Sequence, residues 1–307
     1  MKVITGDITS EKTVLDAMRG VDVVIHCAAH CDLSLEPDEK AMQRTNVDGT
    51  ANLVTAAIEC SVPFLIYVST ADVVIGTDQV YYGSEATTPI PVNPVMGTYA
   101  KTKRQAEVLV IDANTKRLAN GSASLRTLVL RPTVTYGEFD SHFVPGLLRT
   151  TKENGGVLQR IDNIFIRCQV TYAGNVAWAV IRAKDKMRND SSIGGEAFFV
   201  TDDSPILDPF EFFKPILEMH GMRLSAWSVP YWLVILVLSL VLFVVRTLRP
   251  IVQIKVPESW DTKKLRFICN TYFFNRNKAI LRLDYDPLYT PEESNTRAMK
   301  YYQKLKV

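Results

Sequence analysis

The first half of this 307-residue chain alternates short apolar runs with amphipathic stretches. Strands that alternate with helices in this way build βαβ units and a parallel sheet. The apolar runs typical of buried strands are residues 21–26, 63–68, 125–130 and, later, 196–200. The stretches typical of helices are residues 10–19, 38–60, 99–113 and 174–187. We therefore predict an α/β fold with ligands at the carboxyl ends of its strands.

A sheet of this kind usually begins with a strand and a glycine-rich turn that cradles a dinucleotide pyrophosphate. The chain has no such turn, since Gly6 belongs to a Thr-Gly-Asp triplet and Gly20 follows a short helix. Residues 2–5 resemble the end of a strand in the middle of a sheet. We therefore expect a Rossmann-type parallel sheet that is N-terminally truncated by about 60 residues, at ordinary element lengths.

Composition and charge argue against several other classes of protein. Lys and Arg total 35 against 33 for Asp and Glu, so no broad basic field is available for nucleic acid. The five cysteines are irregularly spaced without a C-x-x-C pair, which argues against a disulfide framework or a zinc site and favours a reducing compartment. We expect no metal. The first ten residues lack the apolar core of a signal peptide.

One segment in the last third is unlike a soluble domain. No charged side chain lies between Arg223 and Arg246, and residues 229–245 read VPYWLVILVLSLVLFVV. This run approaches the roughly 20 residues that cross a bilayer, and it has aromatic residues at one end and basic residues at the other. A buried core helix is the alternative, although its polar stripe would be Ser239 alone. We predict a membrane-associated helix at about residues 228–248.

Tyr99 and Lys103 lie four residues apart near the start of a predicted helix, which places them on one face. A phenol has a pKa near 10 and is a poor base at neutral pH. A fixed ammonium nearby favours the phenolate, so the pair can accept a proton from an alcohol. Because this spacing is also common by chance on solvated helix faces, its interpretation depends on its neighbours.

Three neighbouring features support a site. Ser69 and Thr70 place two hydroxyls at the end of a strand, although hydroxyls there also cap turns and helices. Ala28 and Ala29 end an earlier strand with small residues that allow close approach of a nucleotide. Asn46 lies in a predicted helix, where Asn is unfavourable, and a residue against local preference often serves a site.

Together these residues resemble the extended short-chain dehydrogenases. The shared motifs, in order, are T-G-D at 5–7, the strand end at 28–29, N-V-x-G-T at 46–50, V-S-T at 68–70, Y-x-x-x-K at 99–103 and L-R-P-x-x-x-Y-G at 130–137. Y-A-G-N-V-A-W-A at 172–179, Y-D-P-L-Y-T-P-E-E at 285–293 and the apolar segment resemble the 3β-hydroxysteroid dehydrogenase/isomerase branch. The resemblance covers essentially the whole chain.

The resemblance implies a role for each matching residue. Tyr99 matches the general base, and Lys103 its partner, which also contacts the nicotinamide ribose. Thr70 stands where the family has its catalytic serine, with Ser69 before it, and Asn46 steadies the site. The implied cofactor contacts are Asp7 with Ile8 near the adenine, Ala28 and Ala29 along the channel, and Pro132 and Thr133 near the nicotinamide. Asp202 and Asp203 match acids that would move a double bond, with a turn or helix cap as the alternative.

The resemblance also implies a function and an organisation. The chain would oxidise a 3β-hydroxysteroid or sterol by hydride transfer to NAD, with NADP left open, and isomerise Δ5 to Δ4 in a second step. The cofactor domain would occupy residues 1–200 and a substrate lobe 201–307. Because the tail resembles a part that packs with the catalytic lobe, the apolar helix would lie in one leaflet. We expect it on the cytosolic face of the endoplasmic reticulum membrane, or on a mitochondrial membrane.

Other expectations and alternatives follow from the same resemblance. A homodimer is expected, formed through the helices at 38–60 and 99–113. A sterol-4-carboxylate 3-dehydrogenase of the decarboxylating type is an alternative, which substrate assays would separate. The missing glycine-rich turn motivates a third hypothesis, a non-enzymatic membrane-bound relic.

Overall fold

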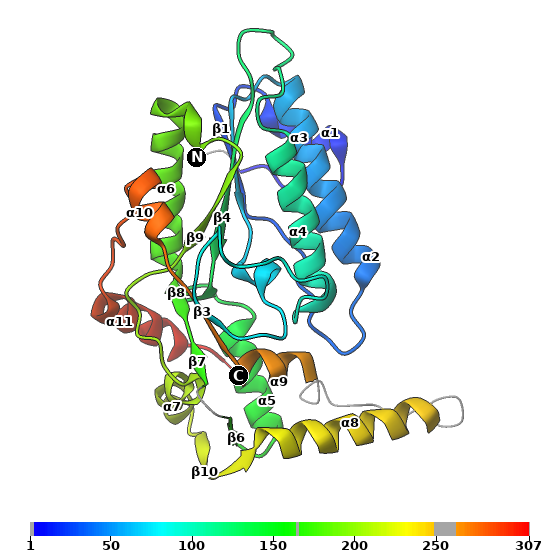
Figure 1. Ribbon diagram of the computed structural model, residues 1–307, viewed down its shortest axis with the longest axis vertical. Coiled ribbons are helices and arrows are strands. Elements are labelled where there is room, and N and C mark those ends of the chain that lie inside the picture. The colour runs from blue at the N-terminus through cyan, green and yellow to red at the C-terminus, as the bar shows by residue number, and fades with distance from the viewer. Residues whose placement is uncertain (1–2, 164–165, 249–261, 307) are drawn as a thin grey trace.

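The structure is a computed structural model that describes residues 3–163, 166–248 and 262–306. Its centre is a parallel sheet between two layers of helices (Figure 1). The strands, in sheet order, are β1 (Val23–His26), β2 (Phe64–Val68), β4 (Arg126–Pro132) and β9 (Glu196–Val200). All four lie where the apolar runs of the sequence predict strands. The expectation of a parallel α/β sheet is confirmed.

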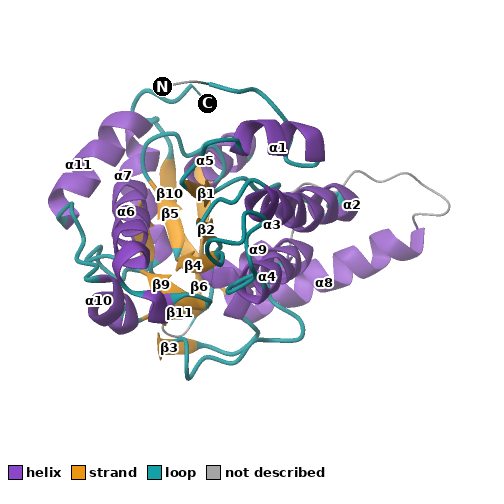
Figure 2. Ribbon diagram, turned by 90° about the horizontal axis from the view of Figure 1, so that it is seen from above, coloured by secondary structure: helices purple, strands orange, loops and turns teal. Residues whose placement is uncertain are grey.

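Alternate side chains of the central strands enter two separate cores, because successive residues of a strand point to opposite faces. Leu65 and Tyr67 of β2 pack under one helical layer, while Ile66 packs under the other. The first layer contains α1 (Glu11–Met18), α2 (Glu39–Met42), α3 (Gly49–Glu59) and α4 (Gly97–Asp112). The second contains α6 (Ala173–Asn189) and α10 (Asn277–Leu283). Figure 2 shows these layers on opposite sides of the sheet.

The long helix predicted at residues 38–60 is interrupted in its middle. Between α2 and α3 runs a π-helical segment, η1 (Gln43–Asp48), with the buried Asn46 inside it. Single π-helical turns inside α-helices occur frequently at functional sites. The helical prediction is thus confirmed in extent, and its irregular centre coincides with the residue that breaks helix preference.

A second lobe is built from short strands and helices below the carboxyl ends of the central strands (Figure 1). Its strands are β3 (Val80–Gly83), β5 (Val134–Tyr136), β6 (Val157–Asp162), β7 (Arg167–Cys168), β8 (Val170–Tyr172), β10 (Arg223–Pro230) and β11 (Thr271–Phe274). Its helices are α5 (Phe143–Glu153), α7 (Pro209–Met219), α9 (Thr262–Ile268) and α11 (Pro291–Tyr302). The strands pair as β5–β8, β6–β10 and β3–β11–β7.

The two lobes do not divide at residue 200 of the chain, because each lobe contains segments from both sides of that position. The second lobe already includes β3 and β5, whereas Leu283 and Tyr285 return to pack with Phe198 in the core of the central sheet. The lobes are therefore distinct in space but interleaved along the chain.

The apolar helix, α8 (Tyr231–Leu248), begins three residues later than predicted. Ser228–Pro230 instead continue β10, where they pair in register with Arg160, Ile161 and Asp162 of β6. Figures 1 and 2 both show α8 extending away from the body of the protein. Among the described residues, no helix is both long and apolar enough to cross a membrane.

Candidate active site

The candidate site lies where β1, β2 and β4 end, beside the first turns of α4. Thr70 follows β2 and begins the 3-10 helix η2 (Ala71–Val74), where its hydroxyl accepts a hydrogen bond from the Asp72 backbone N–H at 3.2 Å. Tyr99 and Lys103 lie one turn apart on α4, which packs against η2. The packing of η2 against α4 thus brings Thr70 near the helix that carries Tyr99 and Lys103.

Lys103 is held in a buried position by β2. Only 2% of its surface is exposed, its Nζ donates a hydrogen bond to the Val68 carbonyl oxygen at 2.9 Å, and Nζ lies 4.3 Å from the centre of the Tyr67 ring. Burial lowers the pKa of Lys103 to about 8, although the nearby Glu107 carboxylate opposes the shift. A buried amine near neutrality can change charge within the ordinary pH range.

The electrostatic environment of Tyr99 differs from the expected one. Burial raises the pKa of the Tyr99 phenol above its usual value, and negative charge at Asp72 and Cys31 raises it further. The ammonium of Lys103 hydrogen-bonds to the Val68 carbonyl oxygen. In this structure the phenol is therefore neutral, and accepting a proton requires further positive charge close to it.

A buried ion-pair network lies directly behind Lys103. Both carboxylate oxygens of Glu107, four residues further along α4, accept hydrogen bonds from Arg131 at 2.9 and 2.7 Å, and Arg104 donates another at 2.7 Å. Although burial raises the pKa of Glu107, these partners outweigh it and leave the pKa lowered. The sequence analysis missed this network. Its signals were the Arg in L-R-P and a Glu one helical turn after the Lys of Y-x-x-x-K.

Asn46 ties the loop after β1 to α4. Its side-chain oxygen accepts from the His30 backbone N–H at 2.7 Å, and its amide donates to the His30 carbonyl oxygen at 2.9 Å and to Thr102 Oγ1 at 3.0 Å. Three hydrogen bonds from one buried amide hold the loop rigidly. Asn46 therefore has the geometry of a positioning residue.

The residues predicted to contact a cofactor occupy two places. Ala28 and Ala29 are exposed at the end of β1, so a flat molecule can reach the backbone there. Asp7 is exposed and accepts a hydrogen bond from the Thr9 backbone N–H at 2.8 Å, while Ile8 packs onto Gly49. A Cβ at Gly49 would lie 2.7 Å from Ile8 Cδ1, which explains the glycine in N-V-x-G-T.

Pro132 ends β4, and Thr133 follows it beside the second lobe. Both are buried, and Thr133 Oγ1 lies 2.6 Å from Thr171 Oγ1, which links β4 to β8. Ser69 is also buried, and its hydroxyl contributes to the lowered pKa of Glu107.

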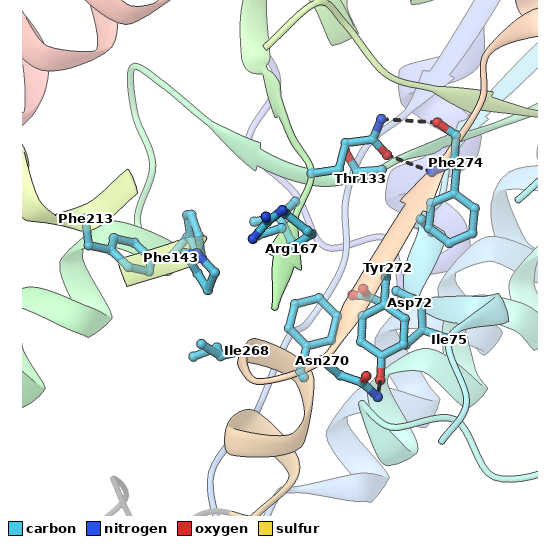
Figure 3. Close-up of a pocket in the computed structure, with 16 residues that line it drawn as sticks. Asp72, Ile75, Thr133, Phe143, Arg167, Phe213, Ile268, Asn270, Tyr272 and Phe274 are labelled. Atoms are coloured by element: carbon cyan, nitrogen blue, oxygen red, sulfur yellow. Dashed lines mark hydrogen bonds between the residues drawn. The ribbon is translucent and has the colours of Figure 1, made fainter. Parts of the chain in front are cut away.

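A narrow cavity of about 30 Å³, open at its mouth, lies between the central sheet and the second lobe. Its wall joins Asp72 and Thr133 to the apolar side chains of Phe143, Phe213 and Phe267. Figure 3 shows Asp72 on the side of the cavity opposite to Phe143 and Phe213. Mostly apolar walls with a few polar groups are typical of small-molecule sites. Asp72 was not among the predicted site residues.

The two acids proposed for isomerisation have other partners. Asp202 is buried and accepts from the Tyr172 and Ser204 backbone N–H groups at 2.8 and 2.9 Å, and from Asn175 Nδ2 at 2.9 Å. Asp203 pairs with Arg276 at 2.7 Å, with 56% of its side chain exposed. Neither aspartate belongs to the cavity wall. Asp202 thus joins the loop after β9 to β8 and α6, Asp203 forms a partly exposed ion pair, and their role in moving a double bond stays a prediction.

The sheet, the Y-x-x-x-K helix and the adjoining lobe define an extended short-chain dehydrogenase fold. A UDP-galactose 4-epimerase matches with a TM-score of 0.67 and 18% identity, over 97% of this chain and 82% of that one. A dTDP-glucose 4,6-dehydratase from Streptomyces venezuelae, with NAD and TYD bound, matches with a TM-score of 0.66 and 18% identity, over 97% and 78%. At this identity the likeness concerns the fold alone.

Sequence similarity identifies the family to which the chain belongs. Residues 1–231 match the 3-beta hydroxysteroid dehydrogenase/isomerase family. The 3 beta-hydroxysteroid dehydrogenase type 7 of Mus musculus is 32% identical over 313 aligned positions, covering 98% of this chain and 82% of that protein. The Homo sapiens protein of the same name is 31% identical over 306, covering 98% and 81%. This chain therefore belongs to the 3-beta hydroxysteroid dehydrogenase/isomerase family, whose members are oxidoreductases acting on CH–OH groups with NAD(P).

Proposed function

We propose that this chain oxidises the 3β-hydroxyl group of a steroid or sterol with NAD and then shifts the double bond from Δ5 to Δ4. The observation that carries the proposal is the gathering of Thr70, Tyr99 and Lys103 beside an apolar cavity. Mostly apolar walls suit a hydrophobic ring system, and Thr70 directly precedes Ala71 and Asp72 of that wall. Family membership supports the same substrate class.

The residues present fit a nicotinamide cofactor on the open side of β1. Ala28 and Ala29 are exposed and small, so they leave room for a flat group at the end of the strand. The ammonium of Lys103 carries three protons and donates one to Val68, so it can also bind a ribose hydroxyl. Asp7 offers an exposed carboxylate to an adenine amino group. When bound, the cofactor supplies the hydride acceptor and a positively charged ring.

The chain's own residues would then hold and move the substrate proton. Thr70 Oγ1 would hold the substrate oxygen, while the Tyr99 oxygen takes the hydroxyl proton. Since the pKa of Tyr99 is raised in this structure, the transfer depends on positive charge at the site. Lys103 would provide part of that charge, and Glu107 supports its protonated form.

Tyr99→Phe tests this assignment, because it removes the proton acceptor and keeps the ring. We expect turnover of a 3β-hydroxysteroid with NAD to fall by at least about 100-fold, with NAD affinity and melting temperature unchanged. The control is Tyr301→Phe, at a tyrosine that packs against Phe139 on the surface. More than a tenth of normal turnover in Tyr99→Phe would contradict the proposal. Preferential oxidation of a 4-carboxysterol would instead favour the decarboxylating alternative.

We further propose that α8 lies in one leaflet of the endoplasmic reticulum membrane, on its cytosolic face. Large apolar side chains are exposed along its length, and they are Trp232, Leu233, Leu236, Val237, Leu240, Phe243 and Val244. Such exposed surface is a mark of membrane or protein contact. Because Leu283 and Tyr285 pack with Phe198 of β9, the chain on both flanks of α8 belongs to one body.

Binding to lipid vesicles tests the role of α8. The double variant Leu236→Asp/Leu240→Asp places two charges on its apolar surface, and we expect its flotation with vesicles to be lost. Ile181→Asp introduces a charge at an exposed apolar position of α6 and should leave flotation intact. Unchanged flotation of the double variant would rule out α8 as the membrane contact. Homodimer formation through α3 and α4 also remains a proposal, and light scattering of the purified protein tests it.

A further inference from the structure

Helix α8 has two sides that differ in exposure. On one side the apolar residues are exposed, and they are Leu233, Leu236, Val237, Leu240, Phe243 and Val244. On the other side they are only partly exposed, and they are Val234, Ile235, Leu238, Val241, Leu242 and Val245. Intervals of three, four and seven residues place each set on one side of an α-helix. Because α9 contacts α8, the partly exposed side faces the protein, and the exposed apolar stripe faces away from it.

Helix α9 lies beside α8 in both views of the molecule (Figures 1 and 2). Its Leu265 and Ile268 pack against the same small core as Tyr231, the first residue of α8. Phe267 stacks on Tyr272, with the two ring centres 5.8 Å apart. These apolar contacts hold α9 on the body of the protein, next to the start of α8.

The polar residues of α9 carry positive charge. Its sequence, TKKLRFI, contains three basic residues and no acidic one. Lys263 and Arg266 are exposed, and Lys264 is half-buried. Burial raises the pKa of Tyr231, and the positive charge of nearby Arg266 acts in the opposite direction. Exposed cations therefore lie close to the start of the apolar helix.

The stretch of sequence around α8 is basic as a whole. From Met219 to Asn270 it has seven Lys and Arg residues against two acidic ones, whereas the entire chain is nearly balanced at 35 against 33. Trp227 and Trp232, with 81% and 66% of their surface exposed, lie at the start of α8. Tryptophan is enriched where a membrane meets water. An exposed apolar stripe with basic and aromatic residues beside it is typical of helices that lie on an anionic membrane.

We propose that α8 and α9 together dock on a membrane leaflet that contains anionic phospholipids, with the apolar stripe among the acyl chains and Lys263 and Arg266 against the negatively charged headgroups. This inference rests on the proposed membrane contact of α8, and it adds the kind of lipid that the contact requires. A helix in the interface enters the boundary between headgroups and acyl chains by only about 5–10 Å. Since α9 contacts the side of α8 opposite to the stripe, its cations lie at the level of the headgroups. Each basic side chain near an anionic surface strengthens binding by about fivefold.

Titration of the purified chain with vesicles, followed by flotation, tests the proposal. One kind of vesicle contains phosphatidylcholine alone, and the other contains phosphatidylcholine with phosphatidylserine. We expect the unmodified protein to bind the mixed vesicles at least about 25-fold more tightly, and added salt to weaken this preference. Lys263→Gln/Arg266→Gln should lose about 25-fold in affinity for the mixed vesicles and keep its affinity for the neutral ones. The matched control is Lys12→Gln/Arg19→Gln, at exposed positions of α1 and its end, far from α8 (Figure 1).

The comparison of the two kinds of vesicle needs no variant, so it does not depend on how well a variant folds. Equal affinity of the unmodified protein for both kinds overturns this inference and leaves the membrane contact of α8 standing. A Lys263→Gln/Arg266→Gln variant that keeps its preference for the mixed vesicles overturns it too, as does a control variant that loses as much. If the unmodified protein binds neither kind, the membrane contact itself fails. Light scattering in mild detergent tests a different occupant, since a dimer that Leu236→Asp/Leu240→Asp converts to a monomer would mean that a second copy covers α8, which also overturns the inference.

Discussion

The buried ammonium of Lys103 should lower the free energy of unfolding of the protein. It carries an ammonium group in a position with 2% exposure, between the Tyr67 ring and the Val68 carbonyl. Burial moves its pKa from 10.5 to about 8, with Glu107 and other acidic neighbours opposing the shift. Below pH 8 the protein must therefore hold a proton on a group that burial favours as neutral. We predict that Lys103→Met makes the protein more stable at pH 7.

The expected gain follows from the size of that pKa difference. At about 1.4 kcal/mol per pKa unit, a fall from 10.5 to about 8 corresponds to about 3 kcal/mol of destabilisation by the charged form. Loss of the hydrogen bond to Val68 costs about 1 kcal/mol. Because methionine fills a similar volume and adapts to irregular space, the net gain in unfolding free energy should be about 2 kcal/mol.

The extra stability of Lys103→Met should decrease as the pH rises. Since the folded pKa lies below the unfolded value, the unfolded chain binds more protons between pH 8 and 10.5. Wild-type stability therefore rises relative to the variant by about 3 kcal/mol through this window, and above it the variant, which lacks the hydrogen bond to Val68, should be less stable by about 1 kcal/mol. Urea denaturation in mild detergent at a series of pH values measures both curves. A variant that is less stable at pH 7, or a difference that does not change with pH, would refute the reasoning.

Three further substitutions test how the structure supports the site. Asn46→Ala removes the three hydrogen bonds that tie the loop after β1 to α4. We expect faster hydrogen exchange in that loop and an NAD affinity lower by about tenfold in calorimetry. Gly49→Val crowds Ile8, and we expect a loss of about 1–3 kcal/mol in unfolding free energy, recovered in part by Ile8→Ala in the same chain. Glu107→Ala leaves Arg131 buried without its carboxylate, and urea denaturation should show a loss of about 3–5 kcal/mol.

Each of these outcomes has a clear opposite. Normal exchange in the loop of Asn46→Ala would mean that the amide does not position it. A Gly49→Val protein of normal stability would show that the neighbouring side chain moves aside freely. If Glu107→Ala lowers the unfolding free energy by less than about 1 kcal/mol, the Arg131 guanidinium must be hydrated in the variant, and the ion pair behaves as an exposed one.

The central sheet could be predicted from the sequence because its signals are local. Strands such as Phe64–Val68 are buried on both faces and read as continuous apolar runs. The short strands of the second lobe gave no such signal. Val80–Gly83 pairs with Thr271–Phe274, nearly two hundred residues away, so its existence depends on a contact that no local pattern records. The predicted start of α8 at residue 228 was wrong for a related reason. Ser228–Pro230 carries no charge and continues the apolar run, but these residues pair with β6 as the end of strand β10.

Some residues of the candidate site could likewise be predicted from local patterns, and others could not. Tyr99, Lys103 and Thr70 form patterns with fixed spacing, and the structure brings them together at one edge of the sheet. Asp72 forms no pattern, because what distinguishes it is the apolar wall contributed by segments of the second lobe. Glu107 of α4 has a spacing signal, but its partner Arg131 comes from strand β4, which lies further along the chain. The burial of such an ion pair can be recognised only when the positions of the helix and the strand that carry its two charges are known.

Burial acts on the three titratable groups of the site in one consistent direction, toward the neutral form of each. It raises the pKa of Asp72 to about 6, lowers that of Lys103 to about 8, and raises that of Tyr99. Asp72 and Lys103 therefore both titrate near neutral pH, and the charge of each shifts the pKa of the other. Asp72 is buried in part by the apolar wall of the cavity, whereas Lys103 is buried between the Tyr67 ring and the end of β2. A ligand that displaced water from the cavity would lower the local dielectric constant and so strengthen the interaction between these two charges.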